Sequence, residues 1–225
     1  MTRNIALATL AALLPIAVCH AQKTPAKLSN PAALKEKAPE KFTASFETTK
    51  GTFVVEFTRS WSPNGADRIY NMVKNGFFDG VKFFRVVPGF VVQFGIHGDP
   101  SISTKWLDSN IPDDKVVASN KKGYVTFAKS SAPNSRSTQL FINLEDNVRL
   151  DSMGFSPVGK VVKGMDVVEK FYGEYGEQVT GLQGEIAANG NRFLEQNFPK
   201  LDGILKCVLA GAPKEPTKAP SKPKK

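Results

Sequence analysis

Two polar residues, Arg85 and Gln93, interrupt the otherwise apolar run FFRVVPGFVVQFG at residues 83–95. Burying a guanidinium is costly unless it is fully paired, so this arginine needs a reason to be there. A fixed cationic donor can stabilise an electron pair that develops during a reaction, and a nearby glutamine can orient it. We therefore ask whether Arg85 and Gln93 serve a reaction. The alternative is a structural arginine that pairs with a carboxylate.

Other reactive sites find little support in the composition. The chain has two His and two Cys, and one of each lies in the first 21 residues. Without that segment only His97 and Cys207 remain, which excludes a histidine-rich metal site and an internal disulfide. Cys207 lies in the apolar run ILKCVLA, which predicts a buried, inert strand residue. A site made of carboxylates alone stays open, but no EF-hand spacing is present, and we expect no metal and no cofactor.

The first 21 residues predict an export signal. Arg3 precedes the apolar run IALATLAALLPIAVCHA, which is too short and too weakly flanked for a membrane span. We expect cleavage after Ala21, and hence a periplasmic or secreted protein. The alternative is lipid attachment at Cys19, which the preceding Val18 fits poorly because a small residue is expected there.

Lysine-rich segments flank the rest of the chain. Residues 22–41 show no sustained apolar period and predict a flexible linker, and residues 212–225 hold five Lys against one Glu and predict a disordered tail. Much of the net charge of +9 therefore lies outside the region 42–211, which we take as the single folded domain. A nucleic-acid groove needs Lys and Arg clustered on folded elements among aromatics, so we expect no nucleic-acid partner.

Short strand patterns dominate residues 42–211, with a few helical ones between them. Alternating runs around Lys50-Gly51 predict a hairpin with Phe53, Val55 and Phe57 on one face. Further strands are predicted within residues 81–95, broken at Pro88-Gly89, and within 123–129, 139–144 and 191–211.

Helices are predicted at two main places. The first has Ser62 as N-cap, Pro63 in the first turn and Asn75-Gly76 as its end. The second follows from the helical spacing within residues 165–172, and a short third helix is expected after residue 190. Residues 96–115, rich in Gly, Pro and polar residues, predict a surface loop. These patterns indicate a mostly antiparallel β structure and leave barrel and sandwich both open.

Three ordered stretches resemble the cyclophilin-type peptidyl-prolyl isomerases. They are FFRVVPGFVVQ at 83–93, GYVTFA with PNSRSTQLFI at 123–142, and LD with VGKVVKGMDVV at 150–168. The resemblance runs from about residue 42 to residue 175. It implies a closed eight-stranded antiparallel β-barrel capped by two α-helices, with an isomerase activity on proline-containing polypeptides, and we expect a monomer.

The resemblance also implies a site. The catalytic arginine falls on Arg85, supported by Gln93, and the residues implied in substrate binding are Phe90, Val91, Ala128, Lys129, Gln139, Phe141, Leu150 and Phe155. Strand alternation places Val91 and Gln93 on one face and Phe90 on the other. For Phe90 to join the same site, the chain must bend just after Pro88-Gly89.

This set of residues suits rotation about an X-Pro bond, whose barrier is roughly 18–20 kcal/mol because rotation breaks amide resonance. As the bond twists, the prolyl nitrogen gains a lone pair, which a fixed cation stabilises more than it stabilises the planar amide. No acid, base, nucleophile or metal is required. The competing class is a non-catalytic module that binds proline on the same fold.

The sequence departs from the family pattern at several of these positions. Phe84 replaces a common histidine, Val91 a methionine, Lys129 an asparagine, and Phe155 approximately a histidine. Arg149 replaces the tryptophan that many members use to bind cyclosporin, which argues against strong cyclosporin binding. These changes are compatible with proline binding and are expected to alter the preference for the residue before the proline.

Overall fold

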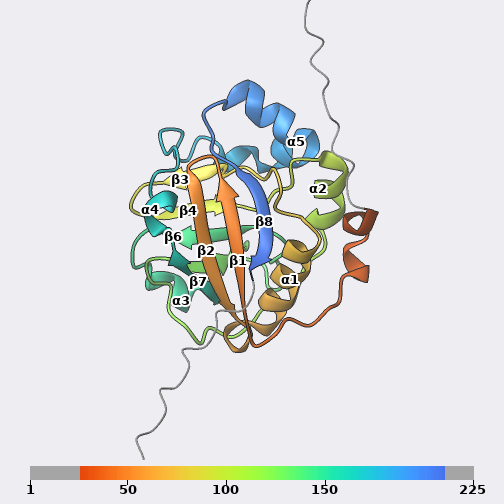
Figure 1. Ribbon diagram of the computed structural model, residues 1–225, viewed down its shortest axis with the longest axis vertical. Coiled ribbons are helices and arrows are strands. Elements are labelled where there is room, and N and C mark those ends of the chain that lie inside the picture. Colours follow the sequence, from red (N-terminus) through yellow and green to blue (C-terminus); the bar gives the residue numbers. More distant parts are fainter. Residues whose placement is uncertain (1–25, 211–225) are drawn as a thin grey trace, which may run out of the picture.

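A single antiparallel sheet of eight strands forms the body of the protein. The computed structural model describes residues 26–210. The strands are β1 (Lys41–Thr48), β2 (Gly51–Thr58), β3 (Arg85–Val87), β4 (Val91–Phe94), β5 (Tyr124–Phe127), β6 (Leu140–Asn143), β7 (Pro157–Lys163) and β8 (Ile204–Ala210). Their spatial order is β3-β4-β6-β5-β7-β2-β1-β8. In Figure 1, β2, β1 and β8 run across the front of β3, β4 and β6, so the sheet curls around its own core.

The curled sheet is open, and the prediction of a closed barrel is wrong in this respect. Strands β3 and β8 form its two edges and do not pair with each other as strands. The segment that precedes β3 does meet the first residue of β8: Gly80 N donates to Ile204 O, and Ile204 N to Val81 O, both at 2.8 Å. The edges are thus joined only at one end, because β3 is three residues long and ends in a turn.

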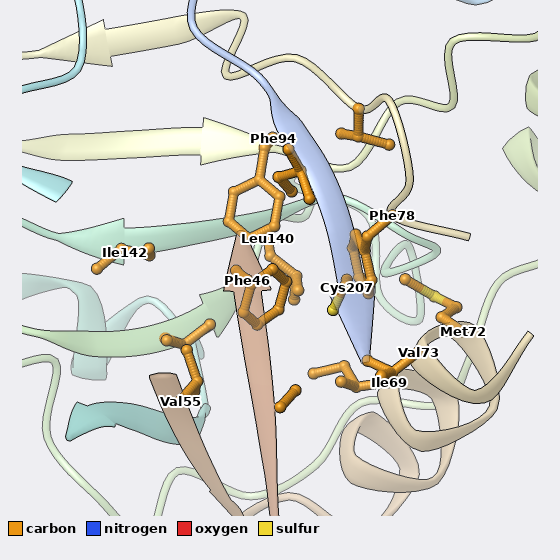
Figure 2. Close-up of a cluster of buried hydrophobic side chains, with 14 of the residues drawn as sticks. Phe46, Val55, Ile69, Met72, Val73, Phe78, Phe94, Leu140, Ile142 and Cys207 are labelled. Atoms are coloured by element: carbon orange, nitrogen blue, oxygen red, sulfur yellow. The ribbon is translucent and has the colours of Figure 1, made fainter. Parts of the chain in front are cut away.

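Alternating side chains of the first hairpin build one wall of the core. Phe53, Val55 and Phe57 of β2 are all buried, as the period-two pattern predicts. Phe46 of β1 stacks on Phe53 with ring centroids 4.8 Å apart. Figure 2 shows Phe46, Phe94 and Leu140 close together, with Cys207 of β8 facing the same cluster.

Cys207 is buried, as predicted for an inert strand residue. Burial raises the pKa of the Cys207 thiol well above its ordinary value. The reactive thiolate form is therefore disfavoured.

Several short helices surround the sheet. The α-helices are α1 (Pro63–Lys74), α2 (Pro100–Leu107), α3 (Arg149–Ser152), α4 (Met165–Val168) and α5 (Gln183–Asn197), and the 3₁₀ turns are η1 (Ala26–Ser29), η2 (Pro31–Ala33), η3 (Arg59–Trp61) and η4 (Thr180–Leu182). The first predicted helix is confirmed as α1. No helix of residues 26–210 is both long and apolar enough to cross a membrane.

Asp114 caps helix α1 from a distant loop. Ser62 precedes the helix as predicted, but its side chain makes no capping bond. Its hydroxyl instead donates to Asp114, whose carboxylate also accepts from the backbone N–H groups of Asn64 and Gly65. The buried Arg136 donates to the same carboxylate at 2.9 Å. One carboxylate therefore satisfies a helix end and neutralises a buried cation.

The Asp114 carboxylate should make folding sensitive to acid. Burial raises its pKa, but bonds from Ser62, Gly65 and Arg136 outweigh burial and hold the pKa below its ordinary value of 3.8. The stabilisation is therefore complete above that pH and is lost as pH falls through the lowered pKa of the folded protein. Asp114→Asn should lower the free energy of unfolding by about 1.5 kcal/mol at pH 7, measured by urea denaturation. A loss no larger than that of the exposed Asp108→Asn would contradict this.

Three predictions about local structure are wrong. Residues 96–115, expected as a loop, contain α2, whose Ile102 and Trp106 are buried one turn apart. The helix expected over 165–172 is only the four-residue α4, and the longer second helix is α5, which begins at Gln183.

The third concerns residues 22–41, expected as a flexible linker. From residue 26 this segment lies on the domain: Leu28 is fully buried, and its carbonyl accepts from Trp106 Nε1 at 2.8 Å. The expected signal peptide, the lipid-attachment alternative at Cys19 and the tail from residue 212 lie outside the described residues.

Candidate active site

Arg85 and Gln93 lie opposite each other on neighbouring strands. They pair in the β3–β4 ladder, and Arg85 Nη1 donates to Gln93 Oε1 at 2.9 Å. Directly opposite side chains of an antiparallel pair are close enough for such a bond. The structure thus brings together the two residues that the sequence singled out, through a hairpin of nine residues.

A chain of amides extends from Gln93 away from the arginine. Gln93 Nε2 donates to Gln139 Oε1 at 2.8 Å, and Gln139 Nε2 donates to Gln183 Oε1 at 2.9 Å. Gln183 in turn donates to the carbonyl of Thr180. Gln93 is buried, and these bonds satisfy its amide at both ends. Gln183 was not predicted, because it lies in a segment without a recognisable motif.

Six predicted substrate-binding residues form one apolar group, separate from the main core. Buried Val91, Phe141 and Leu150 form its centre, and three partly buried side chains pack against them, namely Phe90, Ala128 and Phe155. We call these six residues the Val91 cluster. The rings of Phe141 and Phe155 meet edge to face at 5.8 Å. Residues from β4, β6 and α3 and the loops beside them therefore converge on one surface.

A tight turn allows Phe90 to join this cluster. Gly89 has φ +72°, which disfavours any side chain there, and Phe90 N donates to Val87 O at 2.9 Å. Phe90 thus lies outside β4, and its carbonyl accepts from Leu144 N and Asn147 Nδ2. The bend expected after Pro88-Gly89 is confirmed.

Asn120 and Asp151 fix the wall that carries Leu150 and Phe155. Fully buried Asn120 donates through Nδ2 to Asp151 Oδ1 at 2.7 Å and to Phe155 O at 2.8 Å. Although burial raises the pKa of Asp151, hydrogen bonds from Ser119 and Asn120 hold it below its ordinary value. The carboxylate therefore stays charged and keeps these bonds at neutral pH. Asn120 gave no sequence signal.

Arg85 also carries a carboxylate partner, Glu177, that the sequence did not identify. Arg85 Nε donates to Glu177 Oε2 at 2.8 Å and Nη2 to Oε1 at 2.6 Å. The Thr180 hydroxyl donates to Glu177 Oε2 at 2.6 Å. Hydrogen bonds from Arg85 and Thr180 hold the pKa of Glu177 below its ordinary value. The structure thus contains both the ion pair expected for a structural arginine and the apolar site expected for a catalytic one.

Phe84 explains how Glu177 reaches Arg85. Its side chain, one residue before Arg85, is buried in a second apolar cluster with Ile96, Val179, Ile186, Ala187, Leu194 and Leu201. This cluster holds the segment 173–203 against the outside of the sheet. Gly190 lets α5 approach the backbone at Gly98 closely, because a Cβ at position 190 would lie 2.1 Å from Gly98 O.

Lys129 and Arg149 lie beside the aromatic residues of the Val91 cluster. Lys129 Nζ is 5.4 Å from the Phe155 ring centroid, and Arg149 Cζ is 5.0 Å from that of Phe90. Ala128 N donates to Gln139 O at 2.9 Å, which continues the β5–β6 pairing past the end of β5. Within residues 26–210, no group of three or more His, Cys, Asp or Glu is placed to hold a metal ion.

Comparison with known sequences identifies the family. The model of the cyclophilin type peptidyl-prolyl cis-trans isomerase/CLD family matches residues 43–183. A peptidyl-prolyl cis-trans isomerase of Acinetobacter baylyi is 33% identical over 129 residues, covering 55% of this chain and 68% of that protein. Peptidyl-prolyl cis-trans isomerase B of Escherichia coli is 28% identical over 172 residues, covering 73% and 96%. The chain therefore belongs to the cyclophilin-type peptidyl-prolyl cis-trans isomerase family.

Solved structures share the fold. A cyclophilin of Hirschia baltica aligns with a TM-score of 0.57 at 18% identity, covering 77% of this chain and 76% of that one. A cyclophilin-type isomerase of Cryptosporidium parvum, crystallised in the presence of the dipeptide Ala-Pro, aligns with a TM-score of 0.54 at 17% identity, covering 75% and 99%. The expected cyclophilin-like, mostly β fold is confirmed.

Proposed function

We propose that the protein is an exported peptidyl-prolyl isomerase that accelerates X-Pro rotation in unfolded or flexible protein segments and so assists their folding. The Val91 cluster supplies the apolar surface for the pyrrolidine ring, and Arg85 acts on the twisting amide. Glu177 and Gln93 position the guanidinium. The edge near Ala128 and Lys129 is the region expected to meet the substrate chain.

The observation that carries this proposal is the set of bonds around Arg85. A guanidinium has five N–H groups, and three of those of Arg85 donate to Glu177 and Gln93. The other two, one on Nη1 and one on Nη2, make no hydrogen bond to residues 26–210. The cation is therefore held from two sides and keeps donors for a substrate, beside Phe90 of the cluster, whose ring lies 5.4 Å away.

These free donors suit the chemistry of rotation. The prolyl nitrogen gains basicity only when the amide twists, so a donor aimed at it favours the transition state over the planar ground state. Exchange NMR on an Ala-Pro peptide tests the activity directly. The proposal fails if wild type and Arg85→Ala give the same uncatalysed exchange, which is the behaviour of a binding module.

Export rests on the leader-like composition of residues 1–21. Mass spectrometry of the protein purified from whole cells of a Gram-negative host, membranes included, should give a mature chain that starts at Gln22. A full-length chain would contradict export by cleavage. A mass that includes a diacylglyceryl group on Cys19 would instead assign a lipoprotein.

A further inference from the structure

Two cations lie beside two different aromatic residues of the Val91 cluster. Arg149, on α3, lies over the ring of Phe90, and Lys129, after β5, lies over the ring of Phe155. The end of Lys129 also lies across Gly154, where an added Cβ would be 3.6 Å from Lys129 Cε. These contacts place both charges beside the apolar surface, with Lys129 partly buried and Arg149 still exposed to solvent.

Lys129 and Arg149 are both cations without an ion-pair partner in the part of the chain that the structure describes. Within residues 26–210, no carboxylate lies within ion-pair distance of Lys129 or Arg149. Two carboxylates of the site region have other partners. Glu177 pairs with Arg85, and Asp151 accepts from Ser119 and Asn120. The charge of Arg85 is thus balanced, whereas those of Lys129 and Arg149 are left for a ligand.

We propose that Arg149 and Lys129 make the site selective for X-Pro segments that carry an Asp or Glu next to the proline. This inference rests on the proposed isomerase function and names its substrate class. A substrate whose ring rests on the Val91 cluster places its neighbouring side chains near Phe90 and Phe155, where the two unpaired cations lie. A surface of one sign raises association rates of oppositely charged partners by about 10- to 1000-fold.

The test uses three peptides that differ only in the residue before proline, which is Glu, Gln or Lys, and three more that vary the residue after it. Exchange NMR on wild type should give a kcat/KM about tenfold higher for a Glu peptide than for the Gln peptide, and lower for Lys. The preference should weaken as salt shortens the Debye length.

Variants assign the preference to the two residues. Arg149→Gln with Lys129→Gln should bring the Glu-to-Gln ratio close to one, and Arg149→Lys with Lys129→Arg should keep it. Arg149→Glu should shift the preference towards the Lys peptide. The matched control, Lys27→Gln with Lys105→Gln, removes two exposed cations on η1 and α2, on the other side of the molecule from α3 (Figure 1), and should leave the ratio as in wild type.

The outcomes separate this inference from the function on which it rests. Equal acceleration of all peptides by wild type would overturn the selectivity and leave the isomerase intact. A Glu preference that survives in Arg149→Gln with Lys129→Gln would also overturn it. No acceleration of any peptide would overturn the proposed function itself.

Discussion

Arg85→Ala should lower kcat/KM for an Ala-Pro peptide by about 10²- to 10³-fold, the usual cost of removing one preorganised donor. The reason is that the Arg85 guanidinium lies 5.4 Å from the ring of Phe90 and is held there by both a carboxylate and an amide. No other residue of the hairpin 85–93 carries a positive charge that could replace it. Exchange NMR gives the rate, and a thermal melt checks that the fold persists.

Two further variants sharpen this test. Arg85→Lys keeps the charge but cannot donate to Glu177 at two points and to Gln93 at once, so most of the loss should remain. Arg59→Ala is the matched control, because Arg59 makes the same two-point pair with Asp67, at 2.8 and 2.9 Å, without contacting the Val91 cluster. Loss of activity in Arg59→Ala as large as in Arg85→Ala would point to unfolding instead of catalysis.

Glu177→Ala should lower kcat by about 30-fold with little change in KM. Glu177 has two opposite effects on Arg85. The negative charge of Glu177 weakens the field of the guanidinium, whereas the two hydrogen bonds to Glu177 fix the orientation of the guanidinium. The side chain of Glu177 is 55% exposed, so water screens the first effect. Misplacing a catalytic group by about 1 Å can cost about 10²-fold, so the second effect should dominate. Steady-state kinetics on the Ala-Pro peptide measures both constants.

Glu174→Ala and Glu177→Gln serve as comparisons. Glu174 lies in the same segment and accepts from the Tyr172 hydroxyl, away from Arg85, so its loss should have little effect. Glu177→Gln keeps one acceptor and should lie between alanine and wild type. If both Glu177 variants are faster than wild type, Glu177 restrains Arg85 instead of positioning it.

The pH profile gives a separate measure of the Glu177 contact. Because Arg85 and Thr180 lower its pKa, the carboxylate persists as pH falls through the ordinary range of a glutamate. Wild type should therefore lose activity only below that range. Glu177→Gln, which has no proton to gain, should lack this acid limb.

The parts of the site that the sequence predicts are those whose positions follow from strand alternation and turn geometry within a short stretch of chain. Arg85 and Gln93 sit opposite each other because a short turn at Pro88-Gly89 fixes the register of their strands. Phe141 and Gln93 pair in the next ladder. Period-two alternation and turn chemistry are visible in a single sequence, so most of the Val91 cluster follows from them and from the resemblance.

Contacts between distant segments explain what the sequence missed. Glu177 meets Arg85 across 92 positions, and Asp114 caps α1 from 50 positions away. No local pattern marks either carboxylate as a partner. Helix α2 did carry a signal, since Asp99-Pro100 is a helix start and Ile102 and Trp106 are four residues apart, but Gly and Pro around it favoured a loop.

The glutamine chain beside Arg85 has a polarity. A guanidinium can only donate, so Gln93 must turn its oxygen to Arg85 and its nitrogen to Gln139. Gln139 must then present its nitrogen to Gln183, so one cation dictates the orientation of three amides in succession. Reversing any one of them would set like atoms against each other. Gln183, the first residue of α5, is therefore connected to Arg85 through a chain of hydrogen bonds that all donate in the same direction.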